Sequence, residues 1–335
     1  MTPRRLEEIL RQAATKRVVV IGDLMLDEFV WGKVGRISPE APVPVVEVTR
    51  ETSYPGGAAN VARNLREFVG QTCIIGLVGT DRGGRQLQSL LDECEIETDD
   101  VLEDASFQTI VKTRIIARQQ QVVRVDREEV RAPTAEQVAR VAASVKRELA
   151  NLDAVIFEDY GKGFLSAGLV QQVSDLASAA GKVVTVDPNP RHPLPWDNVT
   201  AVKPNRSEAF LAAGMSWSDP IEPATEDTAL KEAGRVLLEK WGTKYLLITL
   251  GEQGMMLFEG GEVFHIPTKA RQVFDVSGAG DTAIALFTLA LCSGASAREA
   301  ADIANHGSAV VVAKLGTATV SPEELIASFH DDFTV

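Results

Sequence analysis

Short apolar runs alternate along this chain with longer segments of helical periodicity, and this alternation constrains the fold more than any other feature. The expected strands are Arg17–Gly22, Cys73–Val78, Ala154–Phe157, Val183–Asp187, Ala201–Lys203 and Tyr245–Thr249. The expected helices are Ala58–Val69, Gly84–Glu93, Ala135–Leu149, Ala167–Ala180, Glu226–Trp241 and Thr282–Leu291. Several strand runs are apolar throughout, as in strands buried on both faces. The pattern predicts an α/β fold with a mainly parallel sheet, helices on both faces, and ligands at the carboxyl ends of the strands.

Two segments, at about 29–52 and 109–126, do not follow this alternation. The first mixes prolines and glycines with β-branched residues, and the second alternates on either side of Gln119-Gln120 like a hairpin. We expect both to form a small β-sheet that projects over the open end of the core as a lid. An edge hairpin or a dimer contact is the alternative, and the lid could serve as both. Because no internal repeat or low-complexity linker interrupts the chain, residues 1–335 are expected to form a single domain.

Charge and composition exclude several classes of function. The formal net charge of −13 argues against a protein that binds nucleic acid or an anionic membrane surface. The three cysteines have no metal-ligand spacing, and no apolar run reaches the roughly 18 residues of a membrane span. The charged N-terminus lacks the apolar region of a signal peptide, so we expect a cytoplasmic protein.

The segment Asp275-Val-Ser-Gly-Ala-Gly-Asp281 precedes a long apolar helical run. Gly278 and Gly280 allow a sharp turn, and the following helix directs backbone N–H groups and its positive dipole end to the same place. Such a pocket holds an anion, and Asp281 beside it could take a proton from an attacking hydroxyl, as phosphoryl transfer to an alcohol requires. A simple connecting turn is the alternative. The helix N-terminus is expected to favour the charged form of Asp281 and so make it a weak base.

Two further segments suit the hydroxyl groups of a sugar. Asp23 and Asp27 follow the first strand, where carboxylates can accept hydrogen bonds from a diol; one of them could instead cap a turn, and we favour Asp27 as the ligand. In Pro55–Asn60, glycines such as Gly57 allow close approach to the backbone, and Asn60 can both donate and accept. An ordinary helix N-terminus is the alternative for this segment.

The opposite side offers candidates for a nucleotide and its metal. Asn205 and Glu208 lie three residues apart at a helix start, where they could orient a phosphate or Mg²⁺, or form a capping interaction. Thr249 and Gly251 end another strand and suit phosphate groups, although a simple turn is the alternative.

The lid hairpin is basic in an otherwise acidic chain. Its positive residues are Lys112, Arg114, Arg118, Arg124 and Arg127, against Asp126 alone. A solvated basic face is the usual explanation, but the opposing net charge favours a phosphate clamp. Strand alternation allows only about half of these side chains to face a common site.

Together these segments resemble the ribokinase-like family of sugar kinases from about Arg17 to Pro322, above all Gly56–Asn60 and Asp275–Asp281. The resemblance implies a three-layer sandwich with a β lid, Asp281 as the catalytic base, and an anion hole formed by Gly278, Ala279 and Gly280. It implies ATP and Mg²⁺ as cofactors. The further residues that it implicates are Asn205 and Glu208 for Mg²⁺ and phosphate, Thr249, Gly251 and Asn305 for ATP, and Asp275 and Gly316 for K⁺.

Within that family, Arg36–Val45, Asp159–Gly163 and Lys314–Thr317 are similar to the heptose 7-phosphate kinases of lipopolysaccharide-core biosynthesis. The resemblance implies phosphorylation of the anomeric hydroxyl of D-glycero-β-D-manno-heptose 7-phosphate. Glu158 departs from the serine expected before Asp-Tyr. Many relatives carry a second, nucleotidyltransferase domain for which this chain has no room, so another protein is expected to perform adenylylation. A kinase of another sugar, a non-catalytic sensor, and a homodimer formed through the lid all stay open.

Overall fold

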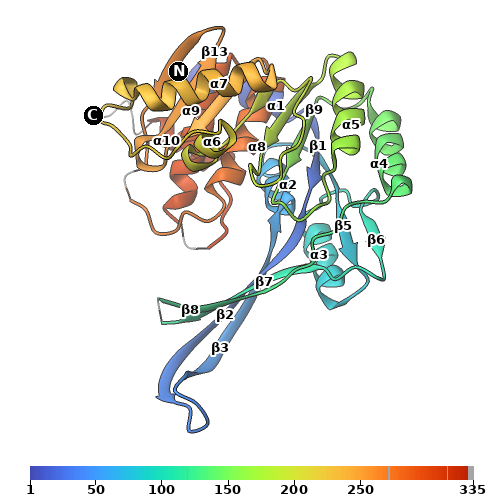
Figure 1. The fold of residues 1–335 in the computed structure, drawn as a ribbon, viewed down its shortest axis with the longest axis vertical. Coiled ribbons are helices and arrows are strands. Elements are labelled where there is room, and N and C mark those ends of the chain that lie inside the picture. Colours follow the sequence, from blue (N-terminus) through green and yellow to red (C-terminus); the bar gives the residue numbers. More distant parts are fainter. Residues whose placement is uncertain (119, 271, 315, 331–335) are drawn as a thin grey trace.

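The computed structural model describes residues 1–118, 120–270, 272–314 and 316–330, and Figure 1 shows a helix-covered body from which a long blade of strands projects. The body is built on one eight-stranded sheet of order β14-β13-β12-β11-β10-β9-β1-β4. Its strands are β1 (Arg17–Gly22), β4 (Gln71–Ile75), β9 (Ala154–Glu158), β10 (Val183–Asp187), β11 (Ala201–Val202), β12 (Tyr245–Thr249), β13 (Met255–Glu259) and β14 (Glu262–Ile266). The strands from β4 to β12 pair in parallel, whereas β12, β13 and β14 pair antiparallel. The predicted mainly parallel sheet is confirmed.

Alternate residues of the sheet face two separate hydrophobic layers. On β1, Val18 and Val20 belong to one buried cluster, whereas Val19 and Ile21 belong to the other. The first layer contains α1 (Pro3–Ala13), α2 (Ala58–Arg66), α3 (Arg82–Glu93), α8 (Ala279–Cys292), α9 (Ala297–Val312) and α10 (Pro322–His330). The second contains α4 (Ala135–Glu148), α5 (Ala167–Ala179), α6 (Arg206–Ala212) and α7 (Thr228–Trp241). The predicted three-layer sandwich is therefore correct, and the strands are buried on both faces as their apolar runs indicated.

Some elements differ from the sequence prediction. The run Cys73–Val78 does not form one strand, because β5 (Leu77–Gly79) leaves the main sheet and pairs with β6 (Leu102–Asp104). The antiparallel pair β13 and β14 and the helices α9 and α10 were not predicted. Among the described residues, no helix has both the length and the apolar character needed to cross a bilayer.

The blade is a four-stranded sheet of order β3-β2-β7-β8, and it confirms that the two irregular segments join in one lid. Its strands are β2 (Leu24–Ile37), β3 (Pro44–Gly57), β7 (Ile110–Ala117) and β8 (Gln120–Arg127). β2 and β7 pair in parallel, although neither segment was expected to suit a buried parallel strand. Gln119, at the predicted hairpin turn, lies outside the described residues.

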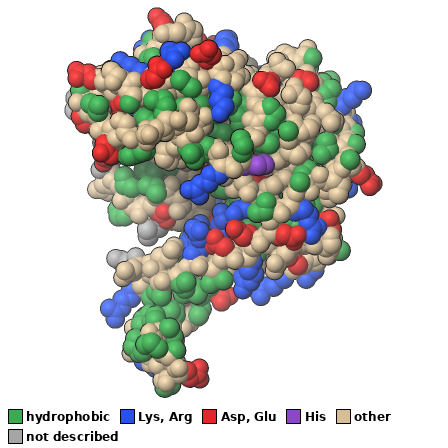
Figure 2. Space-filling view, viewed as in Figure 1, with side chains coloured by type: hydrophobic (Ala, Val, Ile, Leu, Met, Phe, Trp, Pro, Cys, Tyr) green, Lys and Arg blue, Asp and Glu red, His purple; other side chains and the backbone are tan. Residues whose placement is uncertain are grey.

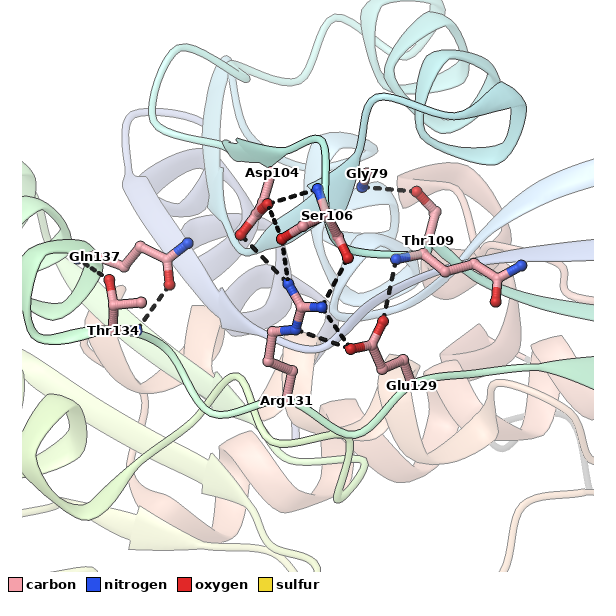
Figure 3. Close-up of polar contacts among 9 residues, drawn as sticks. Gly79, Asp104, Ser106, Thr109, Glu129, Arg131, Thr134 and Gln137 are labelled. Carbon is pink, nitrogen blue, oxygen red and sulfur yellow. Dashed lines mark hydrogen bonds and ion pairs between the residues drawn. The ribbon is translucent and has the colours of Figure 1, made fainter.

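The residues just before β7 and just after β8 form hydrogen bonds to the body (Figure 3). After β8, the Arg131 guanidinium donates to Glu129 Oε1 at 2.6 Å and to the Ser106 carbonyl at 2.7 Å. Before β7, Thr109 Oγ1 accepts from the Gly79 amide at 2.8 Å. The bonds to Gly79 and Ser106 join the base of the lid to the small β5–β6 sheet.

Candidate active site

Asp281 is the third residue of α8 and lies in the wall of a cavity of about 650 Å³. The residue is 6% exposed. Its carboxylate accepts from the Tyr160 hydroxyl at 2.8 Å and from Asn60 Nδ2 at 2.6 Å. The cavity lies over the ends of the central strands, with Glu158, Asp187, Lys203, Asn205, Glu208, Thr249, Gly251, Gly278 and Gly280 among its lining residues. The predicted base is thus buried but faces a cleft.

The turn before α8 requires glycine at position 278. Gly278 has φ +80° and is the residue that precedes the helix; a Cβ there would lie 2.9 Å from Asn60 Nδ2. At Gly280, a Cβ would lie 3.5 Å from Lys203 Nζ. The turn therefore presents the first amides of α8 to the cavity beside a buried ammonium group, an arrangement that suits an anion.

Burial raises the pKa of Asp281 above its ordinary value, although hydrogen bonds from Asn60 and Tyr160 and the charge of Lys203 act in the opposite direction. The expectation that the helix N-terminus makes Asp281 a weak base is therefore wrong in sign. The loss of hydration outweighs the hydrogen bonds and the charge of Lys203, because the carboxylate lies almost fully out of water. A raised pKa brings the group closer to the proton affinity that a general base needs.

The two aspartates after β1 have different surroundings. Asp27 is buried and forms an ion pair with Arg114 on β7, which places it on the face of the lid that turns toward the body. Asp23 instead accepts backbone N–H bonds from Tyr160 and Lys162, each at 3.0 Å, and from Phe164 at 3.1 Å. The carboxylate of Asp23 therefore stabilises the loop after β9. This agrees with the alternative that one of the two aspartates caps a turn.

Replacing Asp23 by asparagine is expected to destabilise the protein by about 1–3 kcal/mol, because an amide group cannot accept all three backbone bonds. Urea denaturation measures this free energy of unfolding, with Asp175→Asn at an exposed position of α5 as the matched control. Unchanged stability with a raised KM for the sugar would instead make Asp23 a substrate ligand.

The turn from β3 into α2 places Asn60 in contact with Asp281. Gly57 has φ +60°, and a Cβ there would lie 2.5 Å from the Asp23 carbonyl, so only glycine lets the strand enter α2 so closely. A side chain at Gly56 would collide with the Asp27 carboxylate. Asn60 is fully buried, and its Oδ1 has no hydrogen-bond partner among the described residues. An acceptor is thus left open beside Asp281.

Only part of the basic hairpin faces the body, as strand alternation requires. Lys112 pairs in register with Asp27, and Arg114 with Arg124, so these side chains share one face of the lid. The Lys112 ammonium lies 5.1 Å from the centre of the Tyr160 ring, and burial lowers its pKa. Arg124 is exposed and bonded to Asp126 at 2.9 Å, so it is separate from the Asp27–Arg114 ion pair. Figure 2 shows Lys and Arg side chains around the hollow between body and lid.

A second cavity, of about 420 Å³, adjoins the first and shares Thr249, Gly251, Val276 and Gly280 with it. Its walls are mostly apolar and include Met255, Val273, Ala279, Asn305 and Val312. Asn305 Nδ2 donates to the Pro267 carbonyl at 2.6 Å. The two cavities together suit a nucleotide, with the base in the apolar part and the phosphates toward Asp281.

Asn205 and Glu208 form a reciprocal capping box at the start of α6. The Glu208 amide donates to Asn205 Oδ1 at 2.9 Å, and the Asn205 amide donates to Glu208 Oε2 at 2.7 Å. The capping alternative is therefore correct, and both residues also line the large cavity. Asp275 and Gly316 lie together, because the Gly316 amide donates to Asp275 Oδ2 at 3.2 Å.

Four residues of the cavity were not predicted as site residues: Tyr160, Glu158, Asp187 and Lys203. They lie at or just after the ends of predicted strands, which was the available signal. Glu158, Asp187 and Asp281 place carboxylate oxygens within 4.8 Å of one another, and Lys203 Nζ is 2.8 Å from Asp187 Oδ2. Three oxygen donors at this spacing fit a hard divalent cation.

The α/β sandwich, with a cleft at the strand ends beside the first amides of a helix, is typical of a class of phosphotransferases. The chain belongs to the pfkB family of carbohydrate kinases, whose model matches residues 15–324. It is accordingly a kinase that phosphorylates a sugar.

Similar proteins include two bifunctional proteins HldE. The one from Desulfatibacillum aliphaticivorans is 42% identical over 94% of this chain and 63% of its own length. The one from Caulobacter vibrioides is 44% identical over 96% of this chain and 65% of its own length. The chain thus spans about two thirds of the length of these relatives.

Solved structures are similar in fold. Arabidopsis thaliana ribokinase complexed with ribose and ATP matches with TM-score 0.69 and 20% identity, over 93% of this chain and 98% of its own. Escherichia coli phosphofructokinase-2 in complex with potassium matches with TM-score 0.75 and 18% identity, over 94% of this chain and 98% of its own. At these identities the likeness establishes the ribokinase-like fold.

Proposed function

We propose that this chain transfers the γ-phosphoryl group of ATP to the anomeric hydroxyl of D-glycero-β-D-manno-heptose 7-phosphate, giving the 1,7-bisphosphate for lipopolysaccharide-core biosynthesis. The HldE relatives support the heptose class, since they match nearly the whole chain at about 40% identity. The observation that carries the chemistry is the Asp281 carboxylate, which lines the nucleotide cavity on one side and is bonded to Asn60 on the other.

In this proposal the acceptor sugar lies between lid and body. Asp27, Gly57 and Asn60 bind its hydroxyl groups, and the open Oδ1 of Asn60 accepts one of them. Asp281 orients the anomeric hydroxyl and takes its proton. Lys112 and Arg114 bind the distal phosphate. Arg124 joins them only after leaving Asp126, with closure of the lid.

ATP lies across the two cavities in the same proposal. Asn305 and the apolar wall hold the adenine, Thr249 and Gly251 contact the phosphates, and the amides of Gly278, Ala279 and Gly280 stabilise the moving phosphoryl group. Lys203 adds positive charge beside Gly280.

Metal ions belong to this site as cofactors. Asn205, Glu208 and the nearby carboxylates would hold Mg²⁺, which when bound neutralises charge on the phosphates. K⁺ would bind at Asp275 and Gly316, which already lie together at the loop beside the anion hole.

We further propose that residues 1–335 form one cytoplasmic kinase domain and that the domain pairs with a second copy through the lid. Exposed valines on the outer strands of the lid, among them Val48 and Val123, support this contact. Sedimentation of the intact chain and of a variant with lysine at both positions tests it, and a dimer unaffected by the substitutions would contradict it.

A panel of acceptors tests the substrate. ADP release is expected to show kcat/KM for heptose 7-phosphate about 100-fold above that for unphosphorylated sugars, since one charge-assisted contact with the distal phosphate contributes about 1.5–3 kcal/mol. Lys112→Met should raise KM only for phosphorylated acceptors. A preference for another sugar would assign a different kinase of this family, and no release with any acceptor would favour a sensor.

A further inference from the structure

Glu158 lies in the wall of the cavity and has a buried carboxylate oxygen without a partner in the described part of the chain. It ends β9 between Gly22 of β1 and Asp187 of β10, and it is 2% exposed. Its Oε2 is buried and has no hydrogen-bond partner among the residues that the structure describes. A buried carboxylate oxygen without a partner is costly, so its position at the cavity wall indicates a missing ligand.

The neighbours of Glu158 increase that cost. Asp187 and Asp281 lie within 4.8 Å of it, measured between carboxylate oxygens. At this separation the negative charges of the three carboxylates repel one another. Lys203 is the ammonium group bonded to this cluster, through Asp187. Three carboxylates against one ammonium leave an excess of negative charge that a divalent cation would balance.

The three carboxylates are not equally available. Asp281 already accepts bonds from Tyr160 and Asn60, and Asp187 accepts from Lys203. Asn205 and Glu208 are engaged with each other in the helix cap. Glu158 differs from these residues, because its buried Oε2 accepts no hydrogen bond from the described residues.

We propose that Glu158, together with Asp187 and Asp281, forms a site that binds Mg²⁺ or Mn²⁺ without nucleotide, so that the protein holds a divalent cation before ATP arrives. Small hard cations prefer carboxylate oxygens, and the cavity leaves room for the water ligands that Mg²⁺ retains. The proposal deepens the kinase function, on which it rests for its role in catalysis, but the binding itself depends on neither the sugar nor ATP.

Titration of the intact chain with Mn²⁺ tests this site in the absence of nucleotide and sugar, by calorimetry and by the electron paramagnetic resonance signal of free Mn²⁺. The wild-type protein is expected to bind one ion, and Glu158→Gln to bind it at least about ten-fold more weakly. Bound Mn²⁺ should raise the melting temperature of the wild type but not of this variant. Glu239→Gln, at an exposed position of α7, is the matched control and should bind as the wild type does.

Failure of the wild type to bind Mn²⁺ at millimolar concentration would overturn the proposal. So would equal binding by wild type and Glu158→Gln, or a loss of binding in Glu208→Gln with none in Glu158→Gln. Circular dichroism reports whether Glu158→Gln folds. If it does not, Glu158→Ser, which has a smaller side chain, and the wild-type titration test the proposal instead. A negative sugar panel together with intact Mn²⁺ binding would reject the heptose assignment alone.

Discussion

Replacing Asp281 by asparagine is expected to lower kcat by about 10²–10⁴-fold with little change in the affinity for ATP. The amide keeps the size of the side chain, and its oxygen can still accept from Asn60 or Tyr160. It has no basic oxygen for the proton of the attacking hydroxyl. The loss should therefore fall on the chemical step, as single-turnover rates with saturating substrates would measure.

The pH dependence of the wild type gives a second view of the same residue. Asp281 acts as a base only when ionised, and burial raises its pKa. The rate should therefore fall on the acid side at a higher pH than for an ordinary exposed aspartate, and this limb should be lost in Asp281→Asn. The exposed Asp175→Asn on α5 is the matched control for the substitution. Turnover within about three-fold of the wild type in Asp281→Asn would remove this residue from its role.

Replacing Arg206 by methionine is expected to destabilise the protein by about 3–5 kcal/mol. The Arg206 guanidinium lies 2.7 Å from Asp227 Oδ2, and the two side chains are 7% and 0% exposed. It also donates to the Ser218 carbonyl at 2.8 Å. Methionine would fill much of the volume but leave a buried carboxylate without its counter-charge, although Asp227 would still cap α7 through the Leu230 amide.

Urea denaturation measures this loss, and the chain offers a matched control. Arg235 pairs with Glu232 and Glu239 on the surface of α7, with 62% of its side chain exposed. Arg235→Met should change the free energy of unfolding by less than about 1 kcal/mol, since exposed pairs are screened by water. The double variant Arg206→Met/Asp227→Asn should recover part of the loss. A cost below about 1 kcal/mol for Arg206→Met would show that the buried pair contributes little.

Much of the fold was accessible from the sequence because its signals are local. β1, β10 and β12 begin and end where their apolar runs do. The helix α8 is the instructive difference: it starts at Ala279, three residues before the predicted Thr282, because Gly278 in the left-handed region already turns the chain into the helix. The alternation in the basic hairpin correctly limited how many of its side chains face the body.

The candidate site was only partly accessible. The motif around Asp281 pointed to a carboxylate beside an anion hole, but its bond to Asn60 joins residues 221 positions apart. Glu158 was noticed only as a departure from the family pattern, and Asp187 and Lys203 were not singled out. Their proximity depends on the register of neighbouring strands, in which Glu158 pairs with Asp187. No local periodicity encodes that register.

By itself, the sequence determined the alternation of strands and helices, the lid and the glycine turns, because hydrophobic periodicity and backbone freedom act over a few residues. Only the tertiary structure decided which acidic groups are structural and which face the cavity. Asp23 and Asp27 are four positions apart, yet one is bonded to a backbone loop and the other to Arg114. It also decided the sign of the pKa shift of Asp281, because the loss of hydration depends on every atom that surrounds the carboxylate.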